Sequence, residues 1–345
     1  MYESLSFTII FVMHISSTLS KKILAWYDNN RRKLPWRVGK KSPKKLYYRL
    51  LSEFMLQQTQ VKTVIPYFIN FTKKYKTLKA LSKSNEKDVL KMWEGLGYYR
   101  RAKNLLACSK QLVRDYKSIL PNTIEEIKKL PGIGNYTGNA LLGLVYNQPT
   151  IAIDGNVKRV FSRYFNKEEK KIDYDQVFEK NKKNLFNINR NADFVEALME
   201  FGALTCKPKN PNCITCCLNK SCNYFKSNNK IKNLRKKMIK IKNYDIFCYI
   251  NKKQQIALTK KNRISFLKNF NLPKIKETNA LSSSHNWKFL KNYKNSISNL
   301  SLNINLYYRF SDRIPSSYNW YSLKKNKEFI PSFTKKIFRQ VSTLF

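Results

Sequence analysis

The stretch LPGIGNYTGNA, residues 130–140, constrains the fold of this chain more than any other. A helical pattern precedes Pro131 and a second one begins near Asn135, so the chain must reverse direction within the short link PGIG. Gly132 and Gly134 can take backbone angles that side chains would forbid. The second helix then begins with unpaired N–H groups, a nest that suits a phosphate oxygen. Such a helical hairpin grips a DNA backbone without reading its sequence, whereas the alternative is an ordinary corner between helices with a glycine cap.

The charge of the chain points to the same class of partner. Its 345 residues include 67 Lys and Arg against 22 Asp and Glu, which gives a formal net charge of +45. This excess is larger than solubility requires and favours a polyanion, most simply nucleic acid, as the partner. Lys, Asn and Ile, the residues of AT-rich codons, are abundant, so mutational drift is the alternative source of part of the charge. The length suggests about two domains.

No segment near the N-terminus suits a membrane span or a signal peptide. The longest apolar run there, FTIIFVM at residues 7–13, is too short to span a bilayer. It also lacks a basic region before it and a small-residue cleavage site after it. We therefore expect a soluble, cytosolic protein. The helical pattern begins only near Leu19, so residues 1–18 are expected to form a loose arm.

The chain divides into two patterned regions joined by a basic segment. Residues 19–225 are helical in pattern, and Thr123 with Glu126 forms a capping box at one helix start. Residues 226–242 contain basic side chains and no acidic ones, which predicts an exposed linker that follows DNA or, alternatively, a solvated tether. Beyond it come the strand-like runs IFCYI, QIALT and LNINLYYRF. These predict a smaller α+β domain at residues 243–345.

The seven cysteines do not suggest disulfides, because their number is odd and five of them crowd into residues 206–222. Four of the five have the spacing C-x6-C-x2-C-x5-C, which can hold one [4Fe–4S] cluster. A zinc ion is the alternative, but the uneven spacing lacks the paired C-x2-C knuckles of a zinc ribbon. Cys217 is interpreted as a neighbour rather than a ligand. The predicted ligands are Cys206, Cys213, Cys216 and Cys222.

The order of these motifs resembles that of the adenine-specific DNA glycosylases of the MutY family, which belong to the helix-hairpin-helix, iron–sulfur glycosylase superfamily. The resemblance covers roughly residues 20–225 strongly and continues weakly to the end of the chain. It rests on LPWR, SEFMLQQTQV, GLGYYRRAKNL, LPGIGNYTG, DGNVKRV and the cysteine loop. It implies a mainly α, helix-hairpin-helix catalytic domain with a [4Fe–4S] loop, followed by a Nudix-like α+β domain. The implied reaction removes adenine mispaired with 8-oxoguanine or guanine from double-stranded DNA.

Adenine excision requires an acid and a separate anion, because the extruded purine must be protonated while a sugar cation develops. Glu53 lies in a helix that is apolar nearly all round, where burial would keep it protonated. The alternative is a buried Glu satisfied by a hydrogen bond. Asp154 follows an apolar run and begins a helix, so it is also a candidate N-cap. The resemblance assigns Glu53 as the acid and Asp154 as the anion at the sugar, with Asn156 in support.

Tyr136 follows the glycine turn directly. Related enzymes that also cut the strand have a lysine at this position, whose amine forms a Schiff base with the sugar, and a phenol cannot do so. We therefore predict a monofunctional glycosylase that uses water, in which Tyr136 hydrogen-bonds a carboxylate such as Asp154. The alternative is a tyrosine that only packs behind the hairpin.

Further residues are assigned to the base and to DNA, and each is equally compatible with a core position or a surface ion pair. Trp36 and Arg37 are expected to line the adenine pocket, and Glu196 matches a family residue that reads adenine. The candidates for a wedge that fills the emptied base stack are Gln57, Gln58 and Tyr98 or Tyr99.

The C-terminal region departs from the family at its lesion-reading loop. The usual Phe-Ser-His aligns with Ile297, Ser298 and Asn299, and the segment FLKNFNLP lacks the usual glycines. We therefore expect weaker discrimination between 8-oxoguanine and guanine.

Two other functions fit parts of the sequence. One is a bifunctional, endonuclease III-like enzyme for oxidised pyrimidines, against which Tyr136 and the additional C-terminal domain argue. The other is a DNA-binding protein without catalysis, against which the retention of Glu53 and Asp154 argues. The protein is expected to be a monomer.

Overall fold

The computed structural model describes residues 13–186, 189–228, 240–262, 264, 267–278, 286–297, 300–324 and 328–345. The chain forms two compact units, each of which contains two separate segments. Residues 1–84 and 104–234 form the first unit, and residues 85–103 and 235–345 form the second. The helices found in the described residues are all too short or too polar to cross a membrane.

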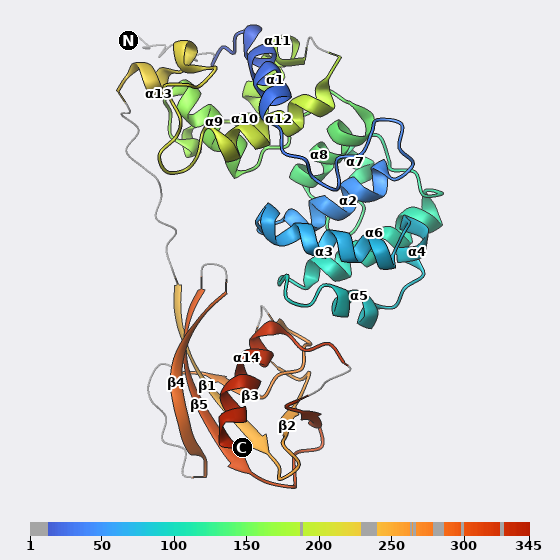
Figure 1. Cartoon of the computed structure of the whole chain (residues 1–345), viewed down its shortest axis with the longest axis vertical. Coiled ribbons are helices and arrows are strands. Elements are labelled where there is room, and N and C mark those ends of the chain that lie inside the picture. The colour runs from blue at the N-terminus through green and yellow to red at the C-terminus, as the bar shows by residue number, and fades with distance from the viewer. Residues whose placement is uncertain are drawn as a thin grey trace, which may run out of the picture. The chain divides into compact units, whose positions relative to one another are not determined.

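The first unit is helical, as the sequence pattern predicts. Figure 1 shows one group of its helices around α12 and another that contains α2, α3 and α8. Helix α12 contacts α1, α8 and α9, and α2 contacts α3 and α8. The helices are α1 (Thr18–Asn30), α2 (Lys45–Leu56), α3 (Val61–Lys74), α4 (Leu78–Ser82), most of α6 (Arg100–Asp115), α7 (Ile124–Ile127), α8 (Asn135–Tyr146), α9 (Gly155–Phe165), α10 (Tyr174–Lys180), α11 (Lys182–Phe186), α12 (Asn191–Leu204) and α13 (Asn223–Lys226).

The predicted helical hairpin is present, and its two helices begin at the expected residues. The side chain of Thr123 accepts a hydrogen bond from the Glu126 N–H at the start of α7. Helix α8 follows the PGIG link and has Gly134 as its N-cap. Gly132 has a φ of 78°, and a Cβ placed there would lie 2.8 Å from a ring carbon of Phe54. Glycine is therefore required at position 132 both by the backbone and by the close approach of α2.

The core around α12 also holds the end of the predicted N-terminal arm. Ile15 is fully buried, and its N–H donates a hydrogen bond of 2.7 Å to the side chain of Asn181. Residues 13–17 are thus packed against the helices rather than loose, because Ile15 contributes to the same apolar cluster as Leu19 and Ile23. Residues 1–12 of the arm lie outside the described residues.

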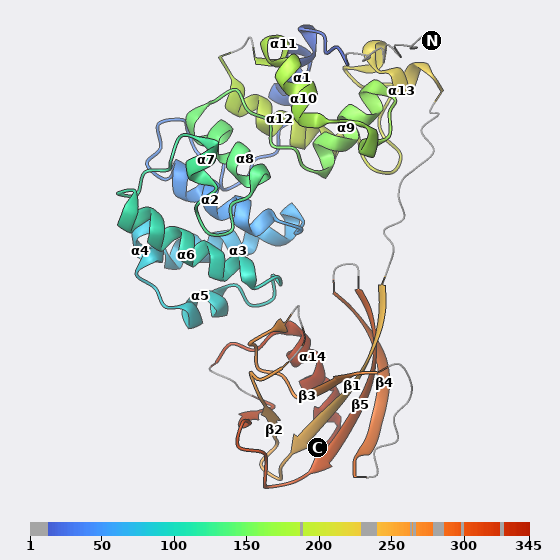
Figure 2. The ribbon, with the colours of Figure 1, turned by 180° about the vertical axis from the view of Figure 1, so that it is seen from behind.

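The second unit contains the predicted C-terminal sheet. Its strands are β1 (Lys240–Ile250), β2 (Gln255–Leu258), β3 (Lys274–Glu277), β4 (Lys288–Ile297), β5 (Leu300–Phe310) and β6 (Asn319–Ser322). The order is β4-β5-β1-β2-β6, with β3 also paired to β1. Strands β1 and β5 are parallel, with Tyr244 opposite Ile304, and the other pairs are antiparallel. Figure 2 shows β1, β4 and β5 side by side.

Apolar side chains of β1 and β5 meet helix α14 (Ser332–Val341) to form the core of this sheet domain. Ile246, Leu306 and Ile337 are fully buried in it. The segment 85–103, with helix α5 (Glu86–Met92), belongs to the same unit. Its Glu94 pairs with Lys335 at 3.0 Å. Of the predicted linker, residues 229–239 lie outside the described part, as do the proposed lesion-reading residues Ser298 and Asn299.

Candidate active site

A pocket of about 500 Å³ opens in the helical unit and is bordered by α2, α8, α12 and the start of α9. Its volume lies within the range typical of small-molecule sites. Most of its polar lining is ionisable. The residues predicted for catalysis and base binding that line it are Trp36, Arg37, Glu53, Tyr136, Asp154, Asn156 and Glu196.

Glu53 is buried in this pocket, with 5% of its surface exposed. Helix α2 places it there because this part of the helix is buried on all sides, with Leu50, Phe54 and Met55 fully enclosed. Burial raises the pKa of Glu53 to about 7, since a carboxylate loses solvation there. The nearby charges of Glu196 and Asp154 also raise this pKa, whereas Arg49 opposes the shift. A proton is therefore available at neutral pH.

Tyr136 lies in the first turn of α8, directly after the hairpin. Its hydroxyl donates a hydrogen bond of 3.2 Å to Glu53 Oε2 and lies 3.4 Å from the sulfur of Met199. The predicted carboxylate partner, Asp154, is not the one bonded, although its charge contributes to raising the pKa of Tyr136. The reason is positional, because α2 packs directly on α8 and brings Glu53 to the hydroxyl.

Asp154 caps helix α9, and both of its oxygens are used. Oδ1 accepts from the N–H groups of Asn156 and Val157 at 2.8 and 2.7 Å, and Oδ2 accepts from the Asn156 amide at 2.7 Å. Burial raises the pKa of Asp154 above its usual value, and the hydrogen bonds from these donors make the increase smaller. The N-cap role and the role of an oriented anion are thus compatible in one residue.

Helix α12 approaches Asn156 very closely at Gly202. A Cβ at position 202 would lie 2.6 Å from Asn156 Cβ and 3.1 Å from its Cα. On the same side, the Arg159 guanidinium donates to Asn156 Oδ1 and to the Gly202 carbonyl, each at 2.7 Å. Arg159 Nε also donates to the Cys206 carbonyl at 2.8 Å. One arginine therefore links the support of Asp154 to the beginning of the cysteine loop.

Two acidic residues of α12 form a buried network with arginines at the pocket wall. Glu196 pairs with Arg49 and, at 3.1 Å, with Arg37, and it accepts a hydrogen bond from Tyr27. Glu200 pairs with Arg37 and, at 3.0 Å, with Arg32. Since ion pairs of this kind fix side-chain positions at a desolvation cost, the network holds two carboxylates in place beside Glu53.

The sequence as a whole matches known DNA repair proteins. Residues 51–185 match a family model described as HhH-GPD superfamily base excision DNA repair protein. The adenine DNA glycosylase of Buchnera aphidicola subsp. Baizongia pistaciae is 36% identical over 320 residues, which cover 87% of this chain and 90% of that protein. The chain belongs to the adenine DNA glycosylase family.

Solved structures share the fold of this family member. A thermostable thymine-DNA glycosylase has a TM-score of 0.54 and 27% identity, and the match covers 60% of this chain and 95% of that one. A trapped endonuclease III–DNA covalent intermediate has a TM-score of 0.51 and 20% identity, covering 62% and 99%. The second likeness concerns the fold alone. Together with the helical first unit and the sheet of the second, these matches confirm the predicted helix-hairpin-helix glycosylase fold.

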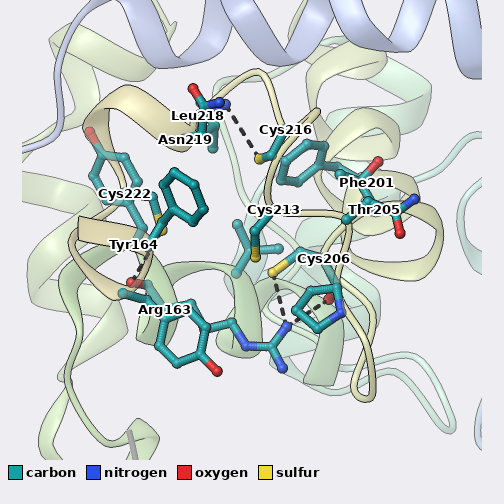
Figure 3. A pocket seen from close by; sticks show the side chains of 15 residues that line it. Arg163, Tyr164, Phe201, Thr205, Cys206, Cys213, Cys216, Leu218, Asn219 and Cys222 are labelled. Atoms are coloured by element: carbon teal, nitrogen blue, oxygen red, sulfur yellow. Dashed lines mark hydrogen bonds between the residues drawn. The ribbon is translucent and has the colours of Figure 1, made fainter. Parts of the chain in front are cut away.

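In this glycosylase the four predicted cysteine ligands line one pocket, shown in Figure 3. The Arg163 guanidinium lies against Cys206 and donates to its sulfur over 3.3 Å. The Leu218 N–H lies 3.4 Å from the sulfur of Cys216. Within the described residues, no group of three or more His, Cys, Asp or Glu side chains is placed to hold a metal ion. The remaining wall is largely apolar, including Val160, Tyr164, Phe201 and Phe225.

The residues predicted as wedges occupy different environments. Tyr98 is 40% exposed and has a φ of 48°, whereas Tyr99 is buried. The Tyr99 hydroxyl lies 3.0 Å from Ser332 Oγ and accepts from the Ser332 N–H at 3.1 Å, so its ring belongs to the interior of the second unit. Gln58 is exposed with a φ of 56°, and Gln57 lies 3.4 Å from the Thr137 hydroxyl. Tyr98 and Gln58 therefore have the exposure that a wedge requires.

Sequence reasoning missed three charged residues of the site: Arg49, Arg159 and Glu200. Each has a local signal. Arg49 is a charged residue inside the apolar stretch of α2, one turn before Glu53. Arg159 and Glu200 stand three and four residues after Asn156 and Glu196, on the same helix faces. Their partners, however, lie far away in the sequence.

Proposed function

We propose that this chain hydrolyses the N-glycosidic bond of adenine mispaired with 8-oxoguanine or guanine in duplex DNA and leaves an abasic site. The observation that carries the proposal is the arrangement of Glu53, Tyr136 and Asp154 in one pocket, with the pKa of Glu53 raised to about 7. An acid that titrates near neutral pH and a separate anion are the two groups that purine excision requires.

The reaction follows from these positions. The extruded adenine enters the pocket, and Glu53 donates its proton to the purine as the bond from the sugar carbon C1′ to the base breaks. The bonding electron pair leaves with adenine, and the cation that develops on the sugar is stabilised by the negative charge of Asp154. Water then adds to C1′, and its proton passes to the Glu53 carboxylate, which restores the acid. No amine stands at position 136, so a Schiff base with the sugar does not form there.

We also propose that the cysteine loop holds a [4Fe–4S] cluster. The support is the donor set itself: Cys206, Cys213, Cys216 and Cys222 line one partly apolar pocket, and Arg163 donates to one sulfur. Thiolate ligands are the usual ones for such a cluster, and hydrogen bonds to the sulfurs tune it. Bound there, the cluster would supply electron-transfer capacity and cross-link the loop. Arg163 and Arg159 would hold the loop against α9.

The sheet domain is proposed to be Nudix-like and to recognise the lesion opposite adenine. This part of the proposal rests on the sequence, in which Ser298 and Asn299 align with the tip of the family's loop. Asn299 can donate and accept a hydrogen bond but lacks a ring that would stack on the lesion. The ratio of excision rates on adenine opposite 8-oxoguanine and opposite guanine should therefore widen in Asn299→His. An unchanged ratio would remove Asn299 from the recognition loop.

The proposed partner is duplex DNA, and the net charge of +45 supports it. We also propose that the protein acts as a monomer, at the nucleoid.

The decisive experiment measures base release under single-turnover conditions from duplexes that contain adenine opposite 8-oxoguanine, guanine or thymine, and from a duplex with thymine glycol. We expect release from the first two alone. Release of thymine glycol with strand cleavage would instead support an endonuclease III-like activity.

A further inference from the structure

Arg49 occupies an unexpected place for an arginine. It lies on α2 one turn before Glu53 and is only 8% exposed. Residues four apart on a helix share a face, and both side chains line the same pocket. A buried cation is costly unless it is fully paired. The structure must therefore provide a reason for a charge at this position.

The pairing of Arg49 is incomplete. One guanidinium nitrogen, Nη1, pairs with Glu196 Oε1. Its Nε is buried and has no hydrogen-bond partner among the described residues. A buried donor without a partner destabilises a fold, because it has lost its hydrogen bond to water. Stability of the fold alone thus does not account for an arginine here.

Glu196 does not depend on Arg49 for compensation. Its other oxygen lies 3.1 Å from Arg37 Nε, and Tyr27 donates a hydrogen bond to it as well. Arg37 is held in turn by Glu200 and by the carbonyl of Arg32. If Arg49 were apolar, Glu196 would still have a cation and a hydroxyl. Arg49 therefore acts on two groups: it is the partner of Glu196 Oε1, and its charge lowers the pKa of its neighbour on α2, Glu53.

We propose that Arg49 is a positioning residue that holds a fixed positive charge against the acid Glu53 and anchors Glu196 from the side of α2. The proposal rests on the proposed function, in which Glu53 is the acid. In physical terms, Arg49 limits the extent to which burial and two neighbouring carboxylates favour the protonated form of Glu53. Glu53 then releases its proton to the purine more readily.

The charges around Glu53 determine whether removal of Arg49 raises or lowers the pKa of Glu53. The pKa of Glu53 is raised by burial, by Glu196 on α12 and by Asp154 at the start of α9. This pKa is lowered by Arg49 on α2 and by the hydrogen bond from Tyr136 on α8. The other charged groups that line the pocket are Arg32, Arg37, Lys62 and Glu200. Without the positive charge of Arg49, less opposes the effect of burial and of the two carboxylates, so the pKa of Glu53 increases further.

The test is the pH dependence of single-turnover adenine excision by the full chain. Arg49→Gln removes the charge and keeps a hydrogen-bond donor for Glu196, whereas Arg49→Lys keeps the charge. In Arg49→Gln we expect the alkaline limb of the profile to move up by about one pH unit, the low end of the effect of a nearby opposite charge. In Arg49→Lys the limb should stay near its wild-type position.

Arg37→Gln is the matched control, because it removes a cation from the same Glu196 without removing the one on α2. Its alkaline limb should move less than that of Arg49→Gln. Equal shifts in these two variants, or an unmoved limb in Arg49→Gln, would overturn the proposal. So would failure of both Arg49 variants to fold, measured by circular dichroism, since Arg49 would then be structural.

Glu53→Gln separates this inference from the proposed function. If Glu53→Gln is inactive and the limb of Arg49→Gln does not move, only the role of Arg49 is wrong. If Glu53→Gln excises adenine at the wild-type rate, the acid itself is wrongly assigned, and the inference fails with it.

Discussion

The hydroxyl of Tyr136 donates a hydrogen bond to Glu53 Oε2 over 3.2 Å, which joins the helical hairpin to the proposed acid. The hairpin that suits a DNA phosphate and the carboxyl group that suits a purine are therefore directly connected, because α2 packs on α8. A hydrogen bond to the ionised form of a carboxyl favours that form. We therefore expect Tyr136 to act on the proton of Glu53 rather than on the sugar.

Glu53→Gln should abolish adenine release while binding of mismatched DNA persists. The amide keeps the shape of the side chain but has no acidic proton to give to the purine, and a general acid contributes about 10²–10⁴-fold in rate. Single-turnover assays measure the excision rate, and gel mobility shifts with the same duplex measure binding. Loss of binding together with excision would indicate a structural defect instead.

Excision should show a bell-shaped dependence on pH. Glu53 acts in its protonated form, so the rate should fall as pH rises through its pKa of about 7. Asp154 acts in its ionised form, and burial raises its pKa, so the rate should fall on the acid side at a higher pH than for an exposed Asp. A profile of single-turnover rate against pH tests both limbs. A rate that is flat between pH 6 and 9 would contradict this assignment of Glu53.

Tyr136→Phe should move the alkaline limb upward, because the hydrogen bond from Tyr136 lowers the pKa of Glu53. A hydrogen bond contributes about 0.5–1.5 kcal/mol, which corresponds to a shift of roughly half to one pH unit. Borohydride should trap no covalent DNA adduct in the wild type. An adduct that forms in the wild type and disappears in Tyr136→Phe would show that Tyr136 reacts with the sugar.

Cys213→Ser should reduce the iron content and the broad visible absorbance expected of a [4Fe–4S] protein, since a hydroxyl is a poor substitute for a thiolate ligand. Cys217→Ser is the matched control, because Cys217 stands beside the ligands in sequence but outside the proposed set. Metal analysis with absorbance spectra provides the readout. Stoichiometric zinc without iron in the wild type would refute the cluster.

Gly202→Ala should slow excision by disturbing the support of Asp154. The new Cβ would lie 2.6 Å from Asn156 Cβ, so we expect Asn156 to shift and its hydrogen bond to Asp154 Oδ2 to weaken. A loss of about tenfold corresponds to 1.4 kcal/mol, the contribution of one good hydrogen bond to a charged group. Gly39→Ala, which meets no atom within 4 Å, should leave the rate unchanged. Equal rates for all three proteins would show that Asn156 does not orient Asp154.

The sequence by itself determined the features that depend on neighbours along the chain. The glycine turn, the Thr123 cap, the start of α9 at Asp154 and the burial of Glu53 within an apolar stretch of α2 all follow from spacing and backbone chemistry over a few residues. Strands β1, β2 and β5 of the C-terminal sheet were predictable for the same reason, whereas β3, β4 and β6 were not predicted. The order of the motifs was sufficient to indicate the family.

Only the tertiary structure decided which side chains meet. Glu53 rather than Asp154 receives the hydrogen bond from Tyr136, across 83 positions in the sequence, and Arg49 reaches Glu196 across 147. Tyr99 lies next to Tyr98 in the chain, yet it is buried against residues of the second unit while Tyr98 is exposed. Such contacts depend on how helices and loops pack over long separations. Local patterns contain no information about that packing, because the same amphipathic helix can present its polar residues to many partners.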